Sequence, residues 1–401
     1  MTEKLYYSQP HLFEFDATVL NCGPEGSGYG VVVDRTCFYP GGGGQPEDRG
    51  SLGGVSVTGM REQDGEIVHC TDAPLPNGPV RGVLDRDRRR DFMEQHTGQH
   101  LLSRALLEVA GLETVSVHFA EETTAIEVDA AALSDETLRA VEEAANRIVK
   151  ENRRVIVREV SPEEAAGFPL RKPPPLEKLI RIVEIEGFDW SACGGVHTAS
   201  TGEVFLIKIL RLEKIRGRLR VHAAMGRRAL ADYARKSAVL QGLARTLTCG
   251  ESEVPAVVEK MAAETRAQAK ELRRLRISQA KITAREAVAG ARRIGDCLFA
   301  SALFEGFGPE ALAAFLDAVA SEPGRFAAAV NREQDGFQWA AMHSIEGAPD
   351  LGELISPILS GLGAKGGGKG NRMQGSGRDP KTAARFLEAV EERLEAFLKN
   401  P

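Results

Sequence analysis

Two short stretches of this 401-residue chain carry side chains that can bind one metal ion together. His96 and His100 are four residues apart in QHTGQHLL, and that spacing places two imidazoles on one face of a helix. Cys193 and His197 repeat the offset in CGGVH, where two glycines keep the intervening segment open. Imidazole and thiolate form a ligand set that suits zinc. The four residues therefore predict a shared zinc site.

The wide gap between the two pairs bears on the kind of site. Small structural zinc modules keep their ligand pairs close in sequence, whereas here the first pair ends at residue 100 and the second begins at residue 193. A shared metal would therefore lie between elements of a full domain. Four ligands still permit a closed structural site, while catalysis requires an open or displaceable coordination position. Both kinds of site are compatible with the residues.

Composition narrows the class of protein. The chain is 42% apolar and 27% charged, as is ordinary for a soluble protein of two or three domains. Its formal net charge is −6, so any binding of RNA must come from local basic patches. Six scattered cysteines indicate reduced thiols rather than a disulfide framework. With no signal-peptide pattern and no apolar run that could span a bilayer, we expect a cytoplasmic protein without membrane contact.

Residues 1–88 have the pattern of a β-rich module. Short strand candidates such as 29–33 and 80–84 are separated by Gly, Pro, Asn and Asp, the usual turn residues. The pattern predicts a β-barrel-like module or a twisted sheet. Within it, TCFYPGGGGQPEDRG at residues 36–50 contains four consecutive glycines, which permit close approach of the backbone to a neighbour. This segment is either a loop at the mouth of a site or a flexible hairpin loop.

Residues 89–225 predict an α+β domain that carries the candidate ligands. A charged run at 85–91 leads into an amphipathic helix that holds His96 and His100 and ends at Gly111. The arginines of this run are a solvated helix start or, beside a metal, a phosphate-binding group. Strands near 115–119, 124–128 and 180–185 and a helix over 136–152 complete the pattern. Cys193 and His197 then fall on a loop between strands.

Two further regions follow. Residues 226–290 predict two helices, the second with a partly apolar seven-residue repeat, which indicates a helical hairpin or a dimer contact. Residues 291–401 predict a C-terminal α/β domain. Its GAKGGGKGNRMQGSG segment places Lys365, Lys369 and Arg372 among glycines, which favours a phosphate-binding loop over a flexible linker. The predicted fold class is therefore α+β, in four regions.

These motifs together resemble a known family. HTGQH followed by CGGVH is similar to the editing domain of alanyl-tRNA synthetases and of the free-standing AlaX alanyl-tRNA editing proteins. TCFYPGGGGQPEDRG resembles the glycine-rich motif of the longer AlaX proteins. The helical hairpin and GAKGGGKGNRMQGSG resemble the C-terminal domain of alanyl-tRNA synthetase, which DHH-type phosphoesterases share. The resemblance covers nearly the whole chain in the order of the long AlaX form, and we expect neither an adenylation domain nor a DHH catalytic motif.

The resemblance implies an enzyme. It implies a zinc-dependent deacylase that hydrolyses Ser-tRNA(Ala), and also Gly-tRNA(Ala), after an error by the synthetase. It implies tRNA binding or homodimerisation by the C-terminal region, with the three cations of the glycine-rich segment at the tRNA. The metal ligands that it assigns are His96, His100, Cys193 and His197.

The resemblance also suggests residues for selectivity. A pocket cannot exclude alanine by size while admitting serine, but it can require a hydroxyl, because without one its buried polar groups stay unpaired. By position after the histidine helix, Ser116 is the candidate, and Gln45 is a candidate to reach the site from the neighbouring module. Gln99 departs from relatives, which often have a small or hydroxyl residue there. The alternatives are an RNA-binding protein with a structural zinc and no hydrolysis, and a metal hydrolase that acts on a small ester or nucleotide.

Overall fold

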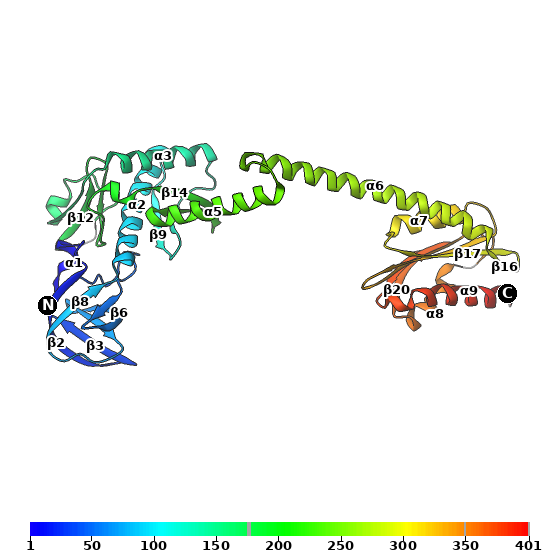
Figure 1. Cartoon of the computed structure of the whole chain (residues 1–401), viewed down its shortest axis with the longest axis horizontal. Helices are drawn as coiled ribbons and strands as arrows, with labels where there is room; N and C mark the ends of the chain where they lie inside the picture. The colour runs from blue at the N-terminus through cyan, green and yellow to red at the C-terminus, as the bar shows by residue number, and fades with distance from the viewer. Residues whose placement is uncertain (175–177, 349, 400–401) are drawn as a thin grey trace. The chain divides into compact units, whose positions relative to one another are not determined.

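The computed structural model describes residues 1–174, 178–348 and 350–399. The chain divides into two compact units, Met1–Gly242 and Leu243–Pro401, each with helices and sheets (Figure 1). The predicted mixed α+β class is confirmed. Within the described ranges, every helix is too short or too polar to cross a membrane.

The first unit begins with a closed ring of six antiparallel strands. They pair in the order β2-β3-β7-β6-β5-β8, and β8 returns to β2. Val31, Val33, Phe38 and Leu52 are buried inside the ring. The strands are β2 (Glu14–Glu25), β3 (Gly28–Val33), β5 (Gly50–Leu52), β6 (Val55–Gln63), β7 (Glu66–Thr71) and β8 (Gly78–Leu84). Beside the ring, β1 (Glu3–Lys4) pairs with β4 (Arg35–Thr36) and leads into the short helix α1 (Leu5–Ser8).

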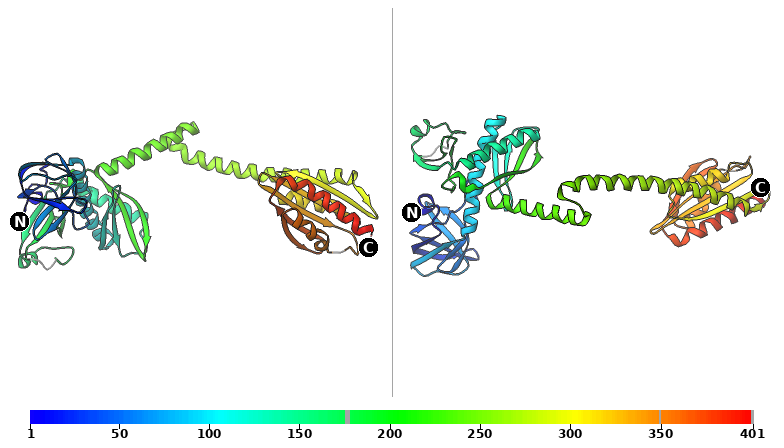
Figure 2. Two further views of the ribbon diagram at one scale, coloured as in Figure 1. Left: turned by 90° about the horizontal axis from the view of Figure 1, so that it is seen from below. Right: turned by 45° about the horizontal axis from the view of Figure 1, so that its top comes forward.

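Helix α2 (Arg86–Ala110) joins the ring to the second sheet of this unit (Figures 1 and 2). The Asp85 side chain accepts the backbone N–H of Arg88 at 3.0 Å and so caps the first turn. Gly111, with φ of 67°, closes the last turn in the left-handed conformation that glycine tolerates. The predicted helix and its end at Gly111 are confirmed.

Helices α2 and α3 (Asp135–Glu151) bury their apolar sides against a four-stranded sheet. Its order is β14-β15-β10-β9, with Ile126 and Val221 at the centre of the core. The strands are β9 (Thr114–Phe119), β10 (Thr124–Val128), β14 (Ile207–Ile215) and β15 (Arg218–Met225). The predicted hairpin at 115–128 is confirmed by the pairing of β9 with β10.

A separate three-stranded sheet leads into the loop that holds the other two candidate ligands. Its order is β11 (Val155–Val160), β12 (Ile180–Ile185) and β13 (Asp189–Ala192), all antiparallel. Strand β13 ends one residue before Cys193. The unit is completed by α4 (Pro162–Ala165), the 3₁₀ turn η1 (Thr201–Val204) and the start of α5 (Gly226–Leu247).

The second unit is a six-stranded sheet with helices on both faces (Figure 2). The end of α6 (Val254–Ala289) packs with α7 (Pro309–Val319) on one face, and α8 (Leu351–Gly361) and α9 (Ala383–Lys399) pack on the other. The order is β16-β17-β18-β19-β21-β20. The strands are β16 (Arg292–Ile294), β17 (Cys297–Glu305), β18 (Arg325–Glu333), β19 (Gly336–His343), β20 (Ala364–Lys369) and β21 (Arg372–Gly377), and two 3₁₀ turns are η2 (Glu251–Glu253) and η3 (Pro380–Thr382).

The glycine-rich segment of this unit is a β-hairpin rather than a loop, while the predicted binding of phosphate by its cations stays a prediction. Strands β20 and β21 pair residue by residue from Ala364↔Gly377 to Lys369↔Arg372. The reason lies in Trp339, whose ring the hairpin covers. A Cβ on Gly366 would lie 2.3 Å from Trp339 Cζ2, and one on Gly375 would lie 2.8 Å from Cε2. The two glycines therefore let the strands lie flat on a large ring.

Candidate metal centre

The two predicted ligand pairs meet in the first unit. One ligand atom from each of His96, His100, Cys193 and His197 lies within 4.8 Å of all the others. The Sγ atom of Cys193 is 3.4 Å from Nε2 of His96 and 3.4 Å from Nε2 of His197. Helix α2 supplies one pair and the loop after β13 supplies the other. The convergence that the sequence predicts is therefore present.

Side chains around the cluster hold the second nitrogen of two of the imidazoles. His96 Nδ1 is 2.7 Å from Oε1 of Gln45, and His197 Nδ1 is 3.2 Å from Oγ1 of Thr97. Metal-binding histidines in proteins usually have their other ring nitrogen fixed in this way. Each ring is thereby turned so that Nε2 faces the cluster.

His100 is held by a buried carboxylate. Its Nδ1 lies 3.2 Å from Oδ2 of Asp189, whose side chain is fully buried. Arg171 Nε donates to Asp189 at 2.5 Å, and Ser191 Oγ donates to it at 3.1 Å. Burial alone would raise the pKa of Asp189, but the bonds to His100 and Arg171 lower it below its ordinary value. An ionised carboxylate on a histidine strengthens that histidine as a ligand.

The protonation states of Cys193 and His197 suit a divalent metal. Burial would raise the pKa of the Cys193 thiol, but the neighbouring His96 and His197 bring it well below its ordinary value. Burial, followed by the proximity of His96, lowers the pKa of His197 to about 3. A thiolate and a neutral imidazole are the forms that bind zinc. Three ring nitrogens and one thiolate sulfur, all within 4.8 Å of one another, therefore fit a zinc ion.

The glycine-rich loop of residues 36–50 brings Gln45 to the cluster. Gly41, Gly43 and Gly44 have φ of 86°, 59° and 88°, values that side chains with a Cβ disfavour. The Gln45 side chain is 3% exposed, and its Oε1 also accepts the backbone N–H of Val196 at 3.0 Å. A single amide thus connects the first module to both halves of the ligand set.

A buried ion pair fixes the end of this loop to helix α2. Arg89 is fully buried, and its Nε donates to Asp48 Oδ1 at 2.9 Å and to Oδ2 at 3.0 Å. Asp48 also accepts the backbone N–H of Tyr39 at 2.7 Å. For Arg89, the predicted solvated position is therefore wrong, because the side chain is fully buried and paired with Asp48. Arg89 lies in DRRRD (residues 87–91) and Asp48 in PEDRG (residues 46–50). Neither sequence pattern indicates that these two residues form an ion pair.

Ser116 lies apart from the cluster. It is exposed on β9, and its hydroxyl donates to Glu127 Oε2 at 2.8 Å. Phe119 is three positions further and therefore on the opposite face, where its ring centroid is 5.1 Å from that of His96. The role of Ser116 in selectivity stays a prediction.

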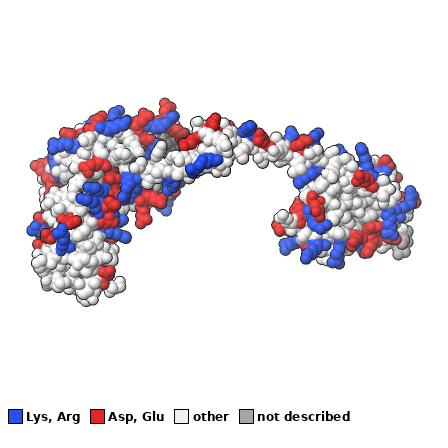
Figure 3. Space-filling view, in the orientation of Figure 1, with Lys and Arg blue, Asp and Glu red and all other residues white. Residues whose placement is uncertain are grey.

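The three predicted tRNA-binding cations belong to the second unit. Lys365 and Lys369 are exposed on β20, while Arg372 on β21 pairs with Asp317 at 2.9 Å. On the face shown in Figure 3, basic and acidic side chains are interspersed on both units. Any attraction for RNA on this face is accordingly local, as the net charge of the chain leads us to expect.

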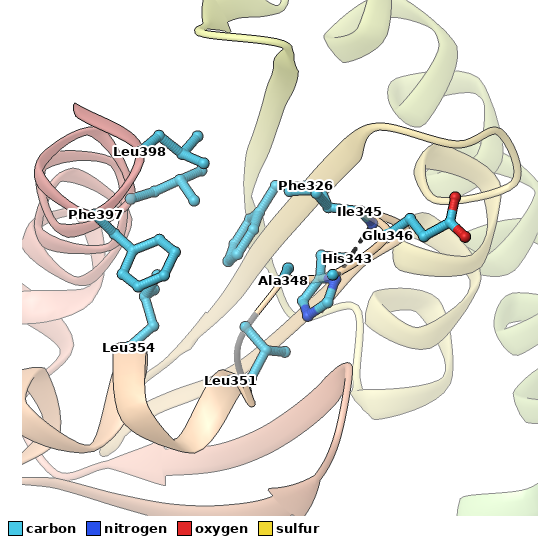
Figure 4. Close-up of a pocket in the computed structure, with 11 residues that line it drawn as sticks. Phe326, His343, Ile345, Glu346, Ala348, Leu351, Leu354, Phe397 and Leu398 are labelled. Atoms are coloured by element: carbon cyan, nitrogen blue, oxygen red, sulfur yellow. Dashed lines mark hydrogen bonds between the residues drawn. The ribbon is translucent and has the colours of Figure 1, made fainter. Parts of the chain in front are cut away.

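The metal centre borders open space. A cavity of about 880 Å³ has His197 and Thr198 in its wall, together with Tyr7 and Arg181. The second unit has a smaller, mainly apolar cavity of about 150 Å³, lined by Phe326, Leu354, Phe397 and His343 among others (Figure 4). Of the two, only the larger one adjoins a candidate metal ligand, so it is the one that bears on chemistry at the cluster.

Comparison with known protein families matches two regions of the chain. Residues 180–220 match the threonyl and alanyl tRNA synthetase second additional domain, and residues 295–396 match the DHHA1 domain. A crystal structure of the C-Ala domain from Aquifex aeolicus alanyl-tRNA synthetase is 22% identical, covering 26% of this chain and 97% of that domain, with a TM-score of 0.25.

Whole-sequence comparison finds synthetases and an editing protein. The alanine–tRNA ligases of Pyrococcus abyssi and Thermococcus kodakarensis are 32% and 33% identical over 97% and 98% of this chain. The chain spans less than half of their length, 43% and 44%. The alanyl-tRNA editing protein Aarsd1 of Mus musculus is 29% identical over 90% of this chain and 91% of its own length. The chain is therefore a homologue of alanyl-tRNA synthetases and of the Aarsd1 editing protein, and its predicted resemblance to the AlaX editing proteins is confirmed.

Proposed function

We propose that this chain is a trans-editing hydrolase that removes serine, and also glycine, from mischarged tRNA(Ala) at a zinc site. The observation that carries the proposal is the meeting of His96, His100, Cys193 and His197 within 4.8 Å beside a cavity. Similarity to an alanyl-tRNA editing protein along 91% of its length supports the substrate class.

The residues of the cluster have separable tasks. His96, His100, Cys193 and His197 would hold zinc, which when bound supplies Lewis acidity to the aminoacyl ester. Asp189 orients His100, and Gln45 orients His96 while bonding the backbone of the second ligand loop at Val196. These bonds preorganise the ligand set.

A structural zinc without hydrolysis is the alternative, because all four candidate ligands belong to the protein. The two functions separate in one experiment. The protein is incubated with Ser-, Gly- and Ala-tRNA(Ala), with and without a zinc chelator, and loss of the ester is followed. We expect rapid loss of serine and glycine, slow loss of alanine, and inhibition by the chelator. Unchanged esters in a sample that contains zinc would leave only the structural role.

Serine selectivity has its own test. Ser116→Val should narrow the ratio of serine to alanine removal if its hydroxyl reads the substrate. An unchanged ratio would place selectivity at another residue. Because Ser116 is exposed, the substitution should leave the fold intact, so the ratio reports on selectivity alone.

We further propose a cytoplasmic protein that binds tRNA(Ala) through its second unit and pairs with a second copy along α6. Five apolar side chains of that helix are about half exposed. All five occupy positions of the predicted seven-residue repeat: Val258, Met261, Leu272, Leu275 and Ile282. Sedimentation equilibrium tests the pairing: Leu272→Glu with Leu275→Glu should give a monomer, and an unchanged mass would exclude this seam.

A further inference from the structure

The large cavity of the first unit has one candidate metal ligand, His197, in its lining. Its volume is about 880 Å³, and its walls come from α1, β11, β12 and the second ligand loop. His197 and Thr198 belong to the lining, and Lys4, His11 and Arg181 contribute nitrogen-bearing side chains to it. A ligand that fills this space would therefore have one end at a candidate metal ligand.

Arg181 places a cation between the cavity and the ligand loop. Its Nη1 donates to the carbonyl oxygens of Cys193 at 2.8 Å and of Gly195 at 2.7 Å. Its buried Nε has no hydrogen-bond partner among the described residues. The guanidinium carbon lies 4.6 Å from the ring centroid of Tyr7, whose hydroxyl donates to the Gly194 carbonyl at 3.1 Å. These contacts fix the group, but they do not neutralise its charge.

Two further side chains lie towards the outer part of the cavity. Lys4 is partly exposed and pairs with Glu62 at 2.6 Å, and His11 is exposed. Glu159 is the single carboxylate in the lining, opposite Arg181 across the β11–β12 pair. Within the lining, nitrogen donors therefore outnumber carboxylates, and a phosphate at Lys4 would take the place of Glu62 as its partner.

We propose that this cavity binds the 3′-terminal phosphodiester of an aminoacylated RNA. Lys4 and His11 contact the phosphate, Arg181 supplies the positive field behind it, and the terminal nucleotide extends inward past His197. The inference rests on the proposed function for the ester. It adds the binding site for the nucleic acid next to that ester.

Binding of a short RNA tests the cavity without any hydrolysis. Fluorescence anisotropy measures the affinity of a labelled CpCpA trinucleotide for the full chain and for Lys4→Gln and His11→Ala. We expect Kd to rise about tenfold in each variant, the size of a lost charged hydrogen bond. Lys208→Gln is the matched control, because Lys208 also lines a cavity and pairs with a glutamate at 2.7 Å. Equal Kd for all four proteins, each with unaltered thermal unfolding, would overturn the proposal.

Competition distinguishes RNA from a free anion. Unlabelled CpA should displace the probe, whereas adenosine and inorganic phosphate should be at least about tenfold weaker, since each makes only part of the interactions. Displacement by inorganic phosphate as strong as that by CpA would overturn the assignment to RNA.

Hydrolysis then separates this proposal from the function itself. Seryl-CpA should have a lower KM than seryl-adenosine, and Lys4→Gln should remove that difference by raising the KM for seryl-CpA. A variant that loses activity on both substrates equally would contradict a phosphate site. A wild-type chain that binds CpCpA through Lys4 but hydrolyses neither ester would leave the RNA site standing and refute the deacylase.

Discussion

Asp189 is the residue whose effect on the metal centre the structure defines most closely. It is fully buried and bonds His100, Arg171 and Ser191. Asp189→Asn keeps the shape but removes the charge, so we expect zinc affinity to fall about 10- to 100-fold. Competition with a chromophoric chelator measures it. Glu213→Gln is the control. Glu213 also bonds a histidine, His222, at 2.7 Å, but neither residue belongs to the cluster. An unchanged zinc affinity in Asp189→Asn would show that the Asp189 carboxylate does not contribute to metal binding.

The ligands themselves make a sharper prediction. Cys193→Ala or His96→Ala should remove bound zinc and reduce deacylation of Ser-tRNA(Ala) to the rate of the free ester. Zinc content by atomic absorption and ester loss are measured on the same samples. Cys249→Ala, a free cysteine of the second unit, should change neither. Full activity without zinc in either ligand variant would refute a catalytic metal.

The sequence predicts residues well when their signal is local. The pairs His96/His100 and Cys193/His197 each have a spacing that shows in a few letters, and their meeting is confirmed. Asp189 gives no such signal, because its partner His100 is 89 positions away. Ser116 illustrates why a position on a strand is hard to assign from sequence. A shift of one residue along the strand moves a side chain to the opposite face.

At the scale of elements, the pair Arg89–Asp48 holds the glycine-rich loop against α2. Arg89→Met leaves the buried carboxylate of Asp48 without its cation, and we expect a loss of about 3 kcal/mol in the free energy of unfolding of the first unit. Urea titration, read by the fluorescence of Trp190, measures it. Arg104→Met is the control, because Arg104 pairs with Glu108 near the surface and should contribute less than about 1 kcal/mol. Equal midpoints would show that the loop is held by other interactions.

Elements follow from the sequence where the apolar period is regular, as in α2 and α3, and are missed where a partner decides the conformation. Residues 364–377 are rich in glycine, which favours a loop in isolation. Their partner is the buried ring of Trp339, whose Nε1 donates to the carbonyl of Lys365 at 3.3 Å. No local pattern connects the glycines with a tryptophan on β19, so the hairpin was beyond prediction.

For the whole molecule, the division of labour between the units yields the last prediction. The metal centre belongs to the first unit, whereas Lys365, Lys369 and Arg372 belong to the second. Replacing these three by Ala should therefore weaken binding of tRNA(Ala) and leave hydrolysis of seryl-adenosine unchanged, because the short ester binds the first unit alone. The dependence of Kd on salt should also become shallower, by about one unit of slope for each phosphate that is no longer neutralised.

The strength of this test depends on charge-matched controls. Lys381, Arg385 and Arg393 are exposed cations of the same unit, so their replacement by Ala removes equal charge from η3 and α9. If both triple variants weaken tRNA binding equally, the basic side chains of the second unit in general account for the binding, and the hairpin has no specific part in it. If only the hairpin variant has a lower affinity, and keeps the rate on seryl-adenosine, then β20 and β21 bind RNA. A parallel fall in both measurements would instead indicate damage to the fold, because Arg372 pairs with Asp317 at the end of α7.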